Sequence, residues 1–401
     1  MSWMLQPFKY QQSIDFDKKL RVTRVEFNGL HSGLQLTLFV GRVFGIMPLS
    51  GLMNRRGHDV SFQLKSLYAI VYFFSFVGQT LMCIMNFYWL LENKMSLTNI
   101  SNFLFYTSSA VSFAILANIS RNWQQLMMRI ESVESKLPPL SENVPQYCNV
   151  TMVLILAAAL VEHIFSVYFG VSVARSCDPN NTAETFFHYD KPWIFAYTSY
   201  STWKGILIEF FNIQSTFIWS YSDLLIMLIS IYLTEHFKTH YRLLKDTLKR
   251  DYFPCDEFRT QHLNIVKLVT MINDTIGIYI LICFGSNMYW TCTQLFYCMN
   301  PVNGIEHTVY FAYSFSFLVV RTLLVLLLAA RVHTASLKPL VLLYEIPNSM
   351  FTTEVERFIG QIINIKVALS GLDFFYVTRT MILTLFGTIV TYELVLLQFN
   401  K

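Results

Sequence analysis

Seven long apolar runs constrain the fold of this chain more than any other feature of its sequence. Each run holds about 20 or more residues, which is the length an α-helix needs to cross a membrane. Only 14% of the 401 residues are charged, against about 25% in a soluble domain, which disfavours a soluble enzyme or a nucleic-acid-binding protein. The sequence therefore predicts an all-α membrane protein with seven transmembrane helices. The expected spans are Leu67–Leu91, Ile100–Ser120, Val150–Val171, Ile206–Leu233, Val269–Met299, Thr308–His333 and Leu372–Phe399.

Lysine and arginine residues indicate the orientation of these helices, because they gather on the cytoplasmic side of a membrane. Residues 1–66, 121–149, 234–268 and 334–371 together hold 22 of them, whereas the segments on the opposite side hold five. We therefore expect a cytoplasmic amino terminus and an extracellular carboxyl terminus. This orientation is the reverse of that in G-protein-coupled receptors, so it disfavours a metabotropic receptor.

The segments that we expect on the extracellular side contain two candidate sites of covalent modification. Asn180 begins an Asn-Asn-Thr triplet, so it is a candidate glycosylation site. Cys177 and Cys298 are the cysteines that an oxidising exterior could reach. One disulfide is therefore possible, although the sequence does not fix its pairing.

The polar segments divide the chain into six parts. We expect the charged residues after the fourth span to continue that helix to a break at Phe253-Pro254, and the apolar spacing within 350–370 predicts an amphipathic helix. Such cytoplasmic helices can join copies of a membrane protein, the alternative being a solvated loop region. The expected parts are a cytoplasmic amino-terminal segment (1–66), helices one to four on the ligand side (67–233), a helical anchor (234–268), helices five and six (269–333), an anchor helix (334–371) and a pore-lining helix (372–401).

The last apolar run carries a single polar stripe. At about 100° per residue, four threonines and Gln398 share an arc of roughly 80° on a helix that is otherwise apolar. A water-filled axis shared by several copies would satisfy these groups and would make this helix the wall of a pore. Alternatively, the threonines bond to the carbonyl four residues back, which the amide of Gln398 cannot do so easily. The residues expected to line or gate the pore are Thr384, Thr388, Thr391, Leu394, Gln398 and Phe399.

Polar and ionisable residues within spans are costly, so they mark candidate ligand-binding positions. Here they share the outer halves of four helices with aromatic residues, a combination suited to binding hydroxyl groups and stacking on a weakly apolar ring. For Asp223 the alternative is a buried ion pair with Arg321, and for the aromatic residues it is packing in the core or at the membrane interface. The candidates are Glu162, His163, Tyr168, Glu209, Asn212, Trp219, Asp223, Asn287, Trp290, Gln294, Tyr310 and Tyr313.

The carboxyl-terminal stretch Thr391–Phe399, which begins Thr-Tyr and ends Gln-Phe, resembles the signature of insect gustatory receptors. Within that family the chain resembles the sugar-receptor branch, and the resemblance covers nearly the whole chain. It supports the candidates Glu162, His163, Trp219 and Asp223 most directly. The stretches that carry the branch resemblance are Gly41–Pro48, Trp219–Leu224, Val367–Gly371 and Thr388–Glu393.

The resemblance implies a seven-helix subunit, four copies of which form a ligand-gated, non-selective cation channel. In that arrangement the last helix lines a central pore, the cytoplasmic ends form a shared anchor, and each subunit has its own outward-facing pocket among helices two to six. We therefore expect a sugar-gated sweet-taste receptor in the plasma membrane of a taste-neuron dendrite, as a homo- or hetero-tetramer.

The expected partners are a sugar, cations and membrane lipid, with no nucleic acid, cofactor, metal or enzymatic activity. One alternative is a channel of the same family that another tastant gates. The other is a secondary sugar transporter, which the lack of an internal sequence repeat argues against. The sequence does not indicate which sugar binds.

Overall fold

The computed structural model describes residues 29–63, 65–250, 253–298 and 304–399, apart from the side chains of 392–399. Within this part of the chain, six helices are long and apolar enough to cross a membrane. An apolar helix at the seventh expected span, α13 (Arg379–Phe399), follows them. The chain is therefore an all-α, multi-pass membrane protein. The six long helices are α3 (Leu67–Glu92), α4 (Leu97–Glu134), α5 (Val144–Cys177), α8 (Thr202–Thr247), α9 (Cys255–Cys298) and α10 (Ile305–Leu337).

The starts of several helices follow from local sequence. Ser66 and Ser96 precede α3 and α4, and their side chains accept hydrogen bonds from backbone amides of the first turn at 3.1 and 3.2 Å. Pro145 lies in the first turn of α5, and Pro339 begins the short helix α11 (Pro339–Tyr344). Proline is favoured there because the first amides of a helix have no partner within it.

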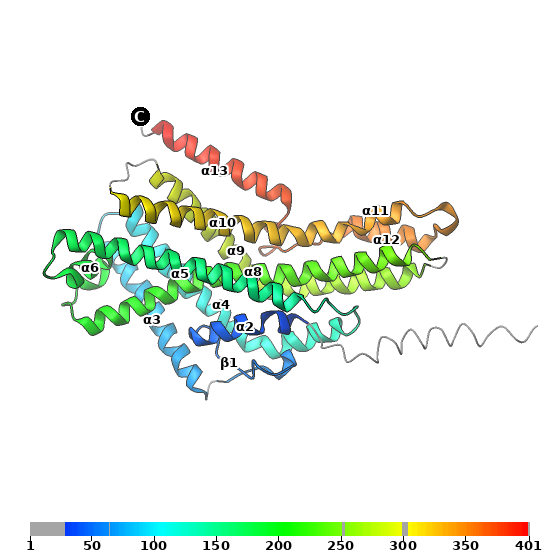
Figure 1. Cartoon of the computed structure of the whole chain (residues 1–401), viewed down its shortest axis with the longest axis horizontal. Helices are drawn as coiled ribbons and strands as arrows, with labels where there is room; N and C mark the ends of the chain where they lie inside the picture. Colours follow the sequence, from blue (N-terminus) through cyan, green and yellow to red (C-terminus); the bar gives the residue numbers. More distant parts are fainter. Residues whose placement is uncertain (1–28, 64, 251–252, 299–303, 400–401) are drawn as a thin grey trace, which may run out of the picture.

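Two helices extend beyond the bundle of apolar runs and form an elongated projection (Figure 1). These are the end of α8 and the beginning of α9, and α11 and α12 (Thr353–Asn364) pack beside them. The amphipathic segment predicted within 350–370 is thus a helix, α12, that buries one face. The projection has a second apolar core, distinct from that of the bundle, made of Leu244, Cys255, Phe258, Leu342, Leu343, Ile346, Val355, Phe358 and Ile362.

The amino-terminal segment contains a buried helix that the sequence pattern did not predict. Helix α2 (Leu30–Val43) packs against α5 and α8 and buries Leu30, Leu34 and Leu38 at four-residue intervals. The remaining short elements are β1 (Leu49–Ser50), η1 (Gly57–Asp59), β2 (Ser61–Phe62), α6 (Thr182–Asp190), α7 (Pro192–Phe195) and η2 (Asn348–Met350).

Helix α13 starts later than predicted, at Arg379 rather than Leu372, because a tight turn precedes it. Leu372 and Asp373 have φ angles of 52° and 58°, a left-handed conformation that a continuous helix excludes. The side chain of Asn273 on α9 holds this turn, since it accepts a hydrogen bond from the Ser370 amide at 3.2 Å. The turn that precedes α13 is therefore fixed to α9.

Glu134, at the end of α4, connects three helices and gives a test of this packing. Its buried carboxylate accepts hydrogen bonds from the Leu30 amide at 2.8 Å and from the Tyr232 hydroxyl at 2.5 Å. Glu134→Ala should leave both donors unpaired, at a cost of about 1–3 kcal/mol each. We expect a lower melting temperature of the protein in detergent. Glu142→Ala, which removes an exposed carboxylate in the next loop, should leave it unchanged, and equal melting temperatures would contradict this role.

Candidate ligand-binding site

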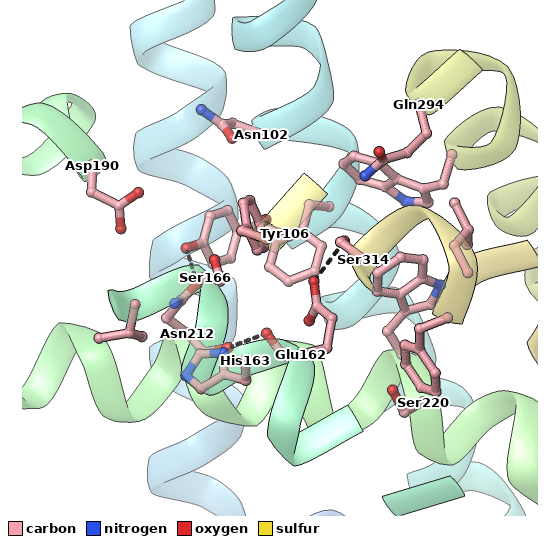
Figure 2. Close-up of a pocket in the computed structure, with 18 of the residues that line it drawn as sticks. Asn102, Tyr106, Glu162, His163, Ser166, Asp190, Asn212, Ser220, Gln294 and Ser314 are labelled. Carbon is pink, nitrogen blue, oxygen red and sulfur yellow. Dashed lines mark hydrogen bonds between the residues drawn. The ribbon is translucent and has the colours of Figure 1, made fainter. Parts of the chain in front are cut away.

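A cavity of about 240 Å³ lies among α4, α5, α8, α9, α10 and the junction of α6 and α7. It occupies the half of the bundle away from the projection of α8 and α9, and Figure 2 shows polar side chains from several of these helices turned toward it. The predicted candidates among its lining residues are Glu162, His163, Asn212, Trp219, Trp290, Gln294 and Tyr310.

Glu162 supplies a carboxylate to the wall of this cavity from α5. The Ser314 hydroxyl on α10 donates a hydrogen bond to it at 2.8 Å, as the dashed line in Figure 2 marks. This bond leaves the second carboxylate oxygen available to accept from a ligand hydroxyl.

A second set of polar side chains connects α4, α5 and α8 at the cavity. The Tyr106 hydroxyl donates to the Asn212 side-chain oxygen at 3.0 Å, and the Asn212 amide donates to Glu209 at 3.2 Å. The His163 ring lies 3.5 Å from the same Glu209 carboxylate. Glu209 thus orients two lining residues without lining the cavity itself.

The junction of α6 and α7 contributes a buried cation to the cavity. Lys191 is 4% exposed and pairs with Asp190. Burial acts to lower the pKa of Lys191, but Tyr106 and the carboxylates of Asp190 and Glu209 outweigh it and raise the pKa above its usual value. Lys191 therefore remains charged at neutral pH and can donate to a ligand oxygen.

Aromatic rings form another wall of the cavity. The ring centroids of Trp219 and Trp290 lie 5.6 Å apart, and Phe105 lies 6.4 and 6.2 Å from them. The guanidinium of Arg321 stacks over Trp219 at 4.1 Å from the ring centroid. Such a wall offers an apolar surface beside a charged group.

Arg321 connects the cavity to a buried ion pair behind it. Its Nε atom lies 3.0 Å from the Asp223 carboxylate, and each side chain is 1% exposed. Nη1 donates to the Ser220 hydroxyl at 2.8 Å, and the Asn287 amide donates to Asp223 at 2.7 Å. The ion pair considered in the sequence analysis is confirmed, and with Asn287 it joins α8, α9 and α10.

Several buried polar atoms at the cavity have no hydrogen-bond partner in the described part of the chain. They include Nε1 of Trp193 and Trp219, Oε1 of Gln294 and Nη2 of Arg321. Unpaired buried polar atoms are costly, so this concentration indicates a place for a polar ligand or water. Among the described residues, no group of three or more His, Cys, Asp or Glu is arranged to hold a metal ion.

Five predicted candidates do not line the cavity. Tyr168 is 61% exposed on the outer surface of α5, and the Tyr313 hydroxyl donates to the Ala158 carbonyl at 3.1 Å. The other three lie behind the lining, where they hold it in place: Glu209, Asp223 and Asn287.

Fifteen residues that line the cavity were not predicted from the sequence. Asn102 and Tyr106 lie four residues apart on one face of α4, but that span has no charged residue to draw attention. Asp190 ends α6 and Lys191 lies between α6 and α7, at a junction of short helices where charged residues are common. Further lining residues that were not predicted are Phe105, Ser166, Val167, Phe186, Trp193, Thr216, Ser220, Ser314, Phe317, Leu318 and Arg321.

The threonines of the polar stripe on α13 are exposed. The hydroxyls of Thr384, Thr388 and Thr391 donate to the carbonyl four residues back at 3.2, 3.0 and 2.8 Å, which is the local bonding considered as an alternative. Ile382 and Ile389, on the opposite side of the helix, are buried, and α13 packs against α9 and α10. The face formed by these threonines is therefore not covered by the described part of the chain. The predicted side chains of Leu394, Gln398 and Phe399 lie outside the described residues.

Comparison with known proteins identifies relatives of the whole chain. Residues 12–401 match the family model described as trehalose receptor. The gustatory receptor for sugar taste 64f of Drosophila melanogaster is 33% identical over 92% of this chain and 81% of its own length. The gustatory receptor 5a for trehalose, from the same organism, is 29% identical over 96% of this chain and 89% of its own length.

The fold also matches a solved structure. The insect olfactory receptor OR5 from Machilis hrabei, in complex with eugenol, superposes with a TM-score of 0.66 at 17% identity. The match covers 92% of this chain and 98% of that one. The two proteins therefore share a fold.

The buried ion pair gives a test of how the cavity is supported. Asp223→Asn should leave the Arg321 charge without a buried counter-ion, at a cost of about 3–5 kcal/mol. We expect a clear fall in the melting temperature, and the double variant Asp223→Asn/Arg321→Gln should recover part of the loss. Asp274→Asn, at an exposed position on α9, is the control. Losses that simply add in the double variant would show that the two groups are not coupled.

Proposed function

This chain belongs to the trehalose receptor family of insect sugar gustatory receptors, and we propose that it forms a cation channel that a sugar opens. The single observation that supports a sugar as ligand is the composition of the cavity wall. Carboxylate, amide and hydroxyl groups stand beside the indole rings of Trp219 and Trp290. Sugars present the matching surfaces, hydroxyls around a weakly apolar ring face.

The proposed ligand is small. The cavity volume of about 240 Å³ lies below the roughly 300–1,000 Å³ of typical drug-sized ligand pockets. A monosaccharide is therefore favoured over a longer oligosaccharide. Glu162, Asn212 and Gln294 are proposed to bind its hydroxyls.

The proposed channel is a tetramer with α13 of each subunit around a central pore. One side of α13 packs on α9 and α10 of its own chain, which leaves the threonine face for the axis. The projection built from α8, α9, α11 and α12 is proposed to join the subunits on the cytoplasmic side, with the carboxyl terminus outside. The back-bonded threonine hydroxyls retain acceptor lone pairs for pore water or cations.

Arg321 is proposed to couple the cavity to the pore helix. It lines the cavity, and its partner Asp223 accepts a hydrogen bond from Asn287 on α9. Asn287 in turn lines a small space between α9 and α10 together with Leu385 and Phe386 of α13. A sugar that contacts Arg321 more favourably in one arrangement of these helices would shift the population toward that arrangement.

The proposed location is the plasma membrane of a taste neuron, with Asn180 glycosylated outside. Two other functions remain as alternatives: a channel of this family that a non-sugar tastant gates, and a secondary sugar transporter. No enzymatic activity is proposed.

The decisive experiment is to record from this chain expressed alone while a panel of monosaccharides and disaccharides is applied. We expect cation currents with resolvable single-channel openings for at least one monosaccharide. Uptake of sugar without single-channel current would favour a transporter. Currents that only non-sugar compounds evoke would overturn the sugar assignment.

The same recordings test the cavity. Glu162→Gln removes a charged hydrogen-bond acceptor, and such bonds contribute about 1.5–3 kcal/mol. We expect the half-maximal sugar concentration to rise about tenfold or more, with unitary conductance unchanged. Tyr168→Phe, on the exposed side of the same helix, should have no effect on either quantity. A change in conductance alone would contradict the assignment of Glu162 to the ligand site.

The threonine stripe can be tested separately. Thr388→Val keeps the shape of the side chain but removes a hydroxyl from the proposed pore wall, which makes the pore more apolar. We expect a lower unitary conductance with little change in the half-maximal sugar concentration, and Gln398→Ala should likewise alter conduction. Ile389→Val, on the buried face of α13, is the matched control. Normal conductance in both Thr388→Val and Gln398→Ala would remove α13 from the pore.

A further inference from the structure

A second cavity, of about 700 Å³, lies between α5, α8 and α10, near the beginning of the projection. It shares no residue with the ligand cavity, and the proposed function makes no use of it. Its walls divide into two chemically different halves, which determine what it can hold.

One half is apolar and lies within the expected membrane spans. Met227 and Ile231 of α8 and Leu324 and Leu328 of α10 line it. The opposite half lies around the cytoplasmic ends predicted for the same spans. It is lined by Glu235, Lys238 and Arg242 of α8 and by Arg331 of α10. The change from apolar to charged therefore coincides with the expected edge of the hydrocarbon layer.

The charged half has more positive than negative groups. Glu235 pairs with Lys238 and Arg242, the distances being 2.5 and 3.3 Å. Arg331 has no carboxylate within ion-pair distance among the described residues. Three basic groups against one carboxylate leave two uncompensated positive charges. A buried hydroxyl, Oγ1 of Thr234, also lines the cavity and has no hydrogen-bond partner in the described part of the chain.

We propose that this cavity is a binding site for an anionic phospholipid of the cytoplasmic leaflet. The apolar half would hold an acyl chain, and the phosphate would lie against Lys238 and Arg331. Basic pockets between transmembrane helices at this level are suited to anionic headgroups, since each basic residue there adds attraction. A soluble phosphate would use the charged half alone and leave the apolar half without a function.

The test is native mass spectrometry of the purified full chain with dioleoylphosphatidylserine and dioleoylphosphatidylcholine, which differ only in headgroup. We expect preferential retention of the serine lipid. Lys238→Gln/Arg331→Gln should reduce this preference by about fivefold for each basic residue removed. Lys249→Gln/Arg250→Gln removes equal charge from the exposed turn that follows α8 and should leave the preference intact.

A second variant separates a lipid from a soluble anion. Leu324→Trp changes the apolar half without a change in charge, at a position that is 38% exposed and so tolerates a larger ring. We expect it to reduce retention of both lipids while the melting temperature stays near that of the unmodified chain. Retention of the serine lipid by both variants would overturn the proposal. So would its displacement by millimolar inorganic phosphate, which would indicate a site for soluble anions.

Discussion

The buried ion pair between Arg321 and Asp223 is the interaction on which the rest of the structure depends. Two charges removed from water are tolerated only when they are paired and hydrogen-bonded, and here Ser220 and Asn287 supply the additional bonds. These groups come from α8, α9 and α10. Because each buried charge needs its partners within bonding distance, the ion pair fixes the three helices relative to one another. The same guanidinium covers Trp219 at the wall of the cavity, so the core of the bundle and the candidate ligand site are held by one group.

The long helices contribute to two separate parts of the molecule. The halves of α4, α5, α8, α9 and α10 away from the projection surround the cavity. The opposite ends of α8 and α9 leave the bundle and build a second apolar core with α11 and α12. Helix α13 packs on the core of the bundle through Ile382, and none of its described residues belongs to the second core. The turn before it is held to α9 by the hydrogen bond between Ser370 and Asn273, and its threonine face is exposed. This is the arrangement that the proposed pore helix requires.

The candidate site shows which of the residues that line the cavity can be predicted from their chemistry alone. Costly groups within spans, such as Glu162 and His163, indicated the region of the cavity, because a charge in a membrane needs a partner or a ligand. The same rule selected Asp223, which the structure places behind the cavity because Arg321 satisfies it. The rule did not select Asn102 and Tyr106, because their side chains are uncharged. They line the cavity only because α4 turns the face that carries them toward α8 and α9. Helix periodicity gives the faces of a helix but not which face meets which neighbour.

The sequence by itself determined that this chain is a bundle of long apolar helices, since runs of about 20 apolar residues are stable only as helices in a membrane. It also determined the amphipathic helix near residue 358 and the polar stripe of the last helix, because both depend on local periodicity. Only the tertiary structure decided that α2 is buried, that α13 begins after a left-handed turn at Leu372, and which polar groups share one cavity. Those outcomes depend on contacts between residues far apart in the chain, and no local pattern contains them.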